Sequence, residues 1–125
     1  MDALWHSFRE GGWSMYPVFA LGLVAVGAAA RFAWRGEHQL LGFIRWLVAA
    51  LLATGVFGFT IGMMKTLHAS QGPTEPALAA RIVMEGTTEA SNNLAAALMF
   101  TVLSCAATAV GQRRFPQPNP SAVAR

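Results

Sequence analysis

The sequence predicts an all-α membrane protein with three transmembrane helices. Only 12% of its 125 residues are charged, whereas a soluble domain carries about 25%, and 54% are hydrophobic. Three stretches, 11–30, 46–64 and 90–112, contain no charged residue. Each is long enough to form a membrane span, because a helix needs about 20 residues to cross a hydrocarbon core of about 30 Å.

The three spans are predicted at residues 13–34, 43–65 and 90–111, within a single membrane domain at residues 1–114. Aromatic residues of the kind that favour the membrane interface stand near the ends of the first two runs: Trp13, Tyr16, Trp34 and Trp46. The first two spans are joined within residues 31–45, so we expect a tight antiparallel hairpin.

The longer connection between the second and third spans contains a turn signal at residues 71–76, which include Gly72, Pro73 and Pro76. Residues 77–85 are predicted to form a short amphipathic helix. We expect Gly86 to end this helix and Thr87 or Thr88 to cap the next one.

The C-terminal tail, residues 115–125, contains three prolines and is predicted to be disordered.

The charged residues predict an orientation. One side carries six basic residues and one acidic residue, a net charge of +5: Arg31, Arg35, Arg45, Arg113, Arg114, Arg125 and Glu37. The other side carries a net charge of −2: Arg9, Lys65, Arg81, Asp2, Glu10, Glu75, Glu85 and Glu89. The positive-inside rule places the N-terminus outside and the C-terminus in the cytoplasm. The pI near 10 therefore reflects basic residues gathered on the cytoplasmic side and does not indicate nucleic-acid binding.

Cleavage of the first span as a signal peptide is the alternative. The acidic residues before this span and the arginines after it disfavour cleavage.

Polar residues inside the spans are the candidates for function, because they are costly in lipid unless partnered. No span has a charged residue at its centre, which argues against a self-sufficient proton relay. Five residues of the third span share one helix face, which suits helix packing or the lining of a narrow pore: Asn93, Ala97, Thr101, Ser104 and Thr108. On the second span, Gly55, Gly58 and Gly62 are predicted helix-packing residues.

Enzymatic, metal-dependent and cofactor-dependent functions are not predicted. The three histidines, His6, His38 and His68, do not face one another within the bilayer, so one chain cannot build a bis-histidine haem site. The single cysteine, Cys105, excludes a disulfide framework and a cysteine-based zinc site and is expected to pack within the third span.

Three motifs in order resemble the MotA/TolQ/ExbB proton-channel family. Residues 11–17, GGWSMYP, resemble its Gly-Gly-x-x-Met-x-Pro start, and residues 56–65, VFGFTIGMMK, resemble its second-span signature. Glu89-Ala90, followed by residues 95–98, is similar to the family's Glu-Ala opening of the last span.

This resemblance implies a multi-pass subunit of the bacterial inner membrane that oligomerises, typically as a pentamer. The ring surrounds a single-span partner of the ExbD/TolR/MotB type, whose membrane Asp carries the proton that powers protein transport or rotation. The implied pore-facing or partner-facing residues are Glu89 at the outer mouth, the five-residue face of the third span, and Phe59 and Leu94, which align with the family's pore threonines.

The sequence also departs from the family pattern. The long cytoplasmic segment between the first two spans is missing, and Phe59 and Leu94 would make a pore lining drier. Two alternatives therefore stay open: a non-conducting scaffold or assembly subunit of the same ancestry, and an unrelated small accessory subunit of a membrane complex.

Overall fold

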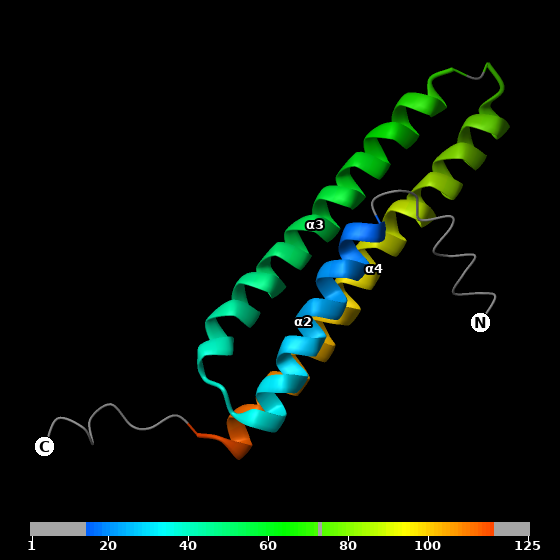
Figure 1. Ribbon diagram of the computed structural model, residues 1–125. Coiled ribbons are helices and arrows are strands. Elements are labelled where there is room, and N and C mark those ends of the chain that lie inside the picture. Colours follow the sequence, from blue (N-terminus) through cyan, green and yellow to red (C-terminus); the bar gives the residue numbers. More distant parts are fainter. Residues whose placement is uncertain (1–14, 73, 117–125) are drawn as a thin grey trace, which may run out of the picture.

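The computed structural model describes residues 15–72 and 74–116, which form three long α-helices (Figure 1). Helix α2 spans Met15–Arg35, α3 spans Gln39–Ser70 and α4 spans Pro76–Arg114, and no strand occurs in the described ranges. All three helices are long and apolar enough to cross a membrane. The predicted all-α class with three candidate spans is therefore confirmed, whereas the orientation in the membrane stays a prediction.

The helices lie side by side, and α3 runs antiparallel to both α2 and α4 (Figure 1). At about 1.5 Å per residue, α2 is about 31 Å long, α3 about 48 Å and α4 about 58 Å. The C-terminal ends of α2 and α4 and the start of α3 meet at one end of the bundle, which we call the arginine end. At the opposite end, the hairpin end, α3 and α4 continue past the start of α2 (Figure 1).

The turn between α2 and α3 is tighter than the predicted connection at residues 31–45, since only residues 36–38 lie outside the two helices. Gly36 has a φ of 66°, and its N–H donates to the carbonyl of Phe32 at 2.9 Å. This left-handed conformation ends α2, because residues with a Cβ adopt it only at a cost. The ring of Phe115, directly after α4, packs against Gly36.

The predicted short helix at residues 77–85 is wrong as a separate element, because these residues form the first turns of the continuous helix α4. Glu75 takes the N-cap position and Pro76 opens the helix, where a proline loses no hydrogen bond. Gly86 stays helical and does not end the helix. The hydroxyl of Thr88 donates to the carbonyl of Met84 at 2.9 Å, a bond typical of a threonine inside a helix rather than of a cap.

The core consists of two apolar clusters along the bundle axis. One contains Val18, Leu51, Ala97 and Phe100, and the other, nearer the arginine end, contains Ala29, Phe32 and Ile44. Two phenylalanine rings occupy space that a facing glycine leaves open, since Phe100 lies against Gly22 and Phe32 against Gly111. These contacts set the register between α2 and α4.

Residues 11–14 of the first family-like motif and residues 117–125 of the predicted tail lie outside the described residues.

Candidate functional site

The interface between α3 and α4 is a ladder of small residues, which we call the seam. Glycines that are buried or half-buried on α3 face small residues on α4, so the two backbones approach closely. A Cβ built on Gly55 would lie 2.5 Å from the Cβ of Ala97, and one built on Gly62 would lie 2.8 Å from the Cβ of Ala90. The ladder consists of Gly55 opposite Ala97, Gly58 opposite Asn93, Gly62 opposite Ala90 and Thr66 opposite Gly86.

The predicted polar face of the third span lies partly inside this seam. Asn93, Ala97 and Ser104 are buried between the helices of the chain itself. Thr101 and Thr108 are half-buried, and their hydroxyls donate to the carbonyls of Ala97 and Ser104 at 2.8 and 2.7 Å. In the isolated chain Asn93, Ala97 and Ser104 therefore pack between helices, and an oligomeric pore lined by the five-residue face stays a prediction.

Phe59 and Leu94 lie on the side of the seam that α2 does not cover. Leu94 is about 60° around α4 from Ala97, whereas Phe100, which packs in the cluster with Val18 of α2, is about 60° the other way. On α3, Leu51 of the same cluster and Phe59 lie about 40° to either side of Gly55 by the same geometry. Both Phe59 and Leu94 are half-buried.

Thr101 lies on the same side, about 40° around α4 from Ala97. We call this surface, made of Phe59, Leu94 and Thr101, the α3–α4 flank.

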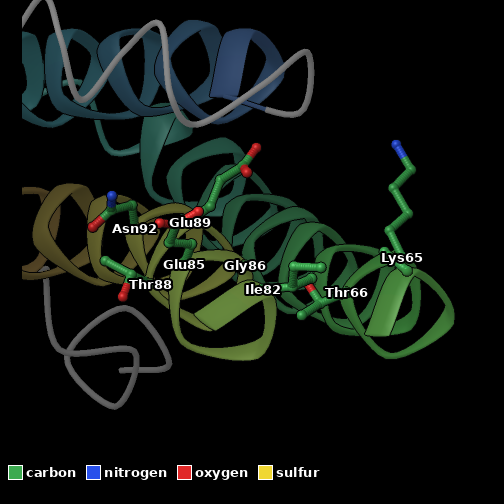
Figure 2. A pocket seen from close by; sticks show the side chains of 9 residues that line it. Lys65, Thr66, Ile82, Glu85, Gly86, Thr88, Glu89 and Asn92 are labelled. Carbon is green, nitrogen blue, oxygen red and sulfur yellow. The ribbon is translucent and has the colours of Figure 1, made fainter. Parts of the chain in front are cut away.

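An open groove of about 720 Å³ lies between α3 and α4 at the hairpin end (Figure 2). It contains Glu89, the residue predicted at the outer mouth, which is exposed. Lys65 on the α3 wall points away from Glu85 and Glu89 (Figure 2) and makes no ion pair within the described part of the chain. The full lining is Lys65, Thr66, Ala69, Ile82, Glu85, Gly86, Thr88, Glu89 and Asn92.

The charged side chains at the groove interact only weakly with one another. Glu85 accepts a hydrogen bond from Nε of Arg81 at 2.9 Å, but these side chains are 67% and 76% exposed. An exposed i,i+4 pair of this kind contributes at most about 0.5 kcal/mol. The groove is therefore an open surface and not an enclosed binding site.

Nothing in the described ranges forms a metal-binding group of three His, Cys, Asp or Glu side chains. His38 lies in the turn at the arginine end, with its ring centroid 5.9 Å from that of Phe32, and His68 is exposed near the hairpin end. His6 lies outside the described residues. The thiol of Cys105 is exposed on the surface of α4 and not packed between helices, so the expected packing role does not hold within the isolated chain.

Sequence reasoning missed the role of Gly86 as the partner of Thr66 in the seam. A signal for it was present, since the seam residues of α4, Gly86, Ala90, Asn93 and Ala97, follow a spacing of four, three and four. That spacing runs through Gly86 without a break, as expected for a single helix.

Comparisons with known protein families, with curated proteins and with solved structures found no match to this chain.

Proposed function

We propose that this chain is a membrane-embedded subunit of an energy-coupling complex of the proton-channel type. Several copies assemble around a single-span partner, and the partner contributes the membrane Asp that carries the proton. In this proposal the chain lies in the bacterial inner membrane with its N-terminus outside and its C-terminus in the cytoplasm, as the charge distribution predicts.

The α3–α4 flank is the observation that carries the proposal. Helix α2 covers one side of the seam, and the other side leaves Phe59, Leu94 and Thr101 half-buried at a surface between two long helices. A single transmembrane helix fits against such a surface, because small seam residues keep α3 and α4 close together. These are also the positions that the family resemblance assigns to the pore or partner.

The placement of charge is the second support. Arg45 and Lys65 on α3 are 20 residues apart, or about 30 Å, which matches the hydrocarbon core. Between them, and between Glu89 and Arg113 on α4, no residue is charged. A proton relay that uses a charged side chain at the centre of the membrane would therefore take that side chain from another protein.

The experiment is site-specific cross-linking in the full chain, co-expressed with a single-span, Asp-bearing protein encoded by an adjacent reading frame. In a Cys105→Ser background, Phe59→Cys and Leu94→Cys should each form a disulfide with a cysteine introduced into the partner's span when a mild oxidant is added. The matched control, Leu23→Cys on the exposed face of α2, should not, because it lies on a helix outside the flank.

Particle counting after purification in native lipids completes this test, and several copies per partner are expected. A stable monomer that recruits no partner contradicts the proposal. One copy per complex favours the accessory subunit instead.

A non-conducting scaffold is the second candidate, and the burial of the polar face favours it. Asn93 and Ser104 are used in the core of the chain, and the hydroxyls of Thr101 and Thr108 bond to their own helix. Phe59 adds a bulky apolar ring to the flank, and dry constrictions block ions.

Proton flux into liposomes, measured with and without the partner, separates the two candidates. Flux in the wild type with its partner supports the channel. Flux that appears only in the variant Phe59→Thr with Leu94→Thr supports a scaffold derived from a channel.

A further inference from the structure

The arginine end carries positive charge that the described part of the chain does not neutralise. Glu37 is the single described carboxylate at this end, and it pairs with Arg31 at 3.4 Å and Arg35 at 4.0 Å. Both pairs are open to solvent, with the arginine side chains 58% and 68% exposed. The other three arginines, Arg45, Arg113 and Arg114, are exposed and make no ion pair with a described residue.

These arginines lie at one depth along the bundle axis. Gly111 lies against Phe32, and the ring of Phe115 lies against Gly36, so the last turn of α4 stands beside the last turn of α2. Arg113 and Arg114 are therefore level with Arg31 and Arg35.

Arg45 belongs to the same band. It is six residues, or about 9 Å, from the start of α3 at the same end. The five arginines thus occupy a band about 10 Å deep. This is a few ångströms deeper than the headgroup layer at one side of a bilayer, a difference that long arginine side chains can span.

Two exposed tryptophans indicate the position of this band of arginines relative to the hydrocarbon core of the bilayer. Trp34 is 83% exposed and precedes Arg35, and Trp46 is 78% exposed and follows Arg45. Exposed indole rings on membrane helices favour the level of the headgroups. They hold the neighbouring guanidinium groups at the level of the lipid phosphates, with which arginine forms paired hydrogen bonds.

We propose that the arginine end is a binding surface for the phosphate headgroups of anionic phospholipids. Its occupants are lipids and not soluble phosphate, because the charged band is continuous with the exposed apolar surface of the three helices, which holds the acyl chains. This inference does not depend on the proposed energy-coupling role or on which side of the membrane the arginines face.

The test measures binding constants of phosphatidylglycerol and phosphatidylcholine for the full chain in detergent, by native mass spectrometry. The variant Arg113→Gln with Arg114→Gln removes two positive charges from the band. The matched control, Lys65→Gln with Arg81→Gln, removes two positive charges from the hairpin end.

Each basic residue near an anionic surface contributes about fivefold in affinity, so the first variant should lose about thirtyfold of the preference for phosphatidylglycerol. The control should lose less than about twofold.

A single variant covers the case in which the double arginine variant misfolds. Arg45→Gln alone should lose about fivefold of the preference for phosphatidylglycerol. Circular dichroism checks that Arg45→Gln and the double arginine variant keep the helix content of the wild type. Millimolar inorganic phosphate should not displace the lipid. The proposal is overturned if the wild type does not prefer phosphatidylglycerol, which would favour an acidic protein as the partner. It is equally overturned if the two double variants lose the same preference, or if inorganic phosphate displaces the lipid.

Discussion

Replacing Gly55 by alanine will force α3 away from α4 near the middle of the seam. The new Cβ would lie 2.5 Å from the Cβ of Ala97, whereas carbon atoms in ordinary contact are about 3.5–4.0 Å apart. The two helices must therefore separate by about 1 Å at this point. The loss is spread along the seam, because the pair of Gly62 and Ala90 further along it is also closely packed, with 2.8 Å between a Cβ built on Gly62 and the Cβ of Ala90.

The expected magnitude follows from two opposing effects. Overpacking a close-packed site costs about 1–3 kcal/mol. Alanine offsets at most about 1 kcal/mol of this, because it is the better helix former. We therefore expect Gly55→Ala to lower the free energy of unfolding by about 1–2 kcal/mol.

The chain offers a matched control and a rescue. Gly42 is on the same helix, but a Cβ there would meet no atom within 4 Å, so Gly42→Ala should be neutral or slightly stabilising. Adding Ala97→Gly to Gly55→Ala returns the lost space, and the double-mutant cycle should show a coupling of about 1–2 kcal/mol.

The assay is reversible unfolding of the full chain in mixed micelles titrated with a denaturing detergent, followed by far-UV circular dichroism. Unfolding of Gly55→Ala at the same midpoint as Gly42→Ala would contradict the expected separation of α3 and α4. Failure of Ala97→Gly to restore stability to the Gly55→Ala variant would contradict it as well.

Three further outcomes are expected. Amide hydrogen exchange at Gly86 should be much slower than at Gln71 and Gly72, which lie outside the helices, because Gly86 lies inside a continuous helix; equal rates would mean that the helix breaks there. Ser104→Ala should raise stability by about 1 kcal/mol, since the hydroxyl is fully buried and forms no hydrogen bond with a described residue; a clear loss in thermal unfolding would reveal a partner for it. Gly36→Ala should lower the free energy of unfolding by about 1–2 kcal/mol, because of its positive φ and because the new Cβ would meet the ring of Phe115; an unchanged thermal unfolding curve would contradict this.

Composition and the spacing of charged residues were enough to predict the fold class and the number of candidate spans. Lipid offers no hydrogen-bond partners, so an apolar run of about 20 residues must satisfy its backbone internally, and a helix does so within one segment. For the same reason the charged residues stand at the ends of the runs, and the structure gathers Arg31, Arg45 and Arg113 at one end. The glycines of α3 indicated close packing because of their spacing alone.

What those helix faces touch became visible only in the packing of the three helices. Gly86 has the composition signal of a helix end, yet it stays helical, in line with its regular spacing from the other seam residues of α4. That Thr66 of α3 is the residue packed against it is shown by the structure alone. The face with Asn93 and Ser104 suited a pore and a packed core equally well in sequence, and the position of α3 and α2 placed those residues inside the chain. A helix periodicity defines which residues share a face, whereas the partner of that face depends on contacts between residues far apart in the sequence.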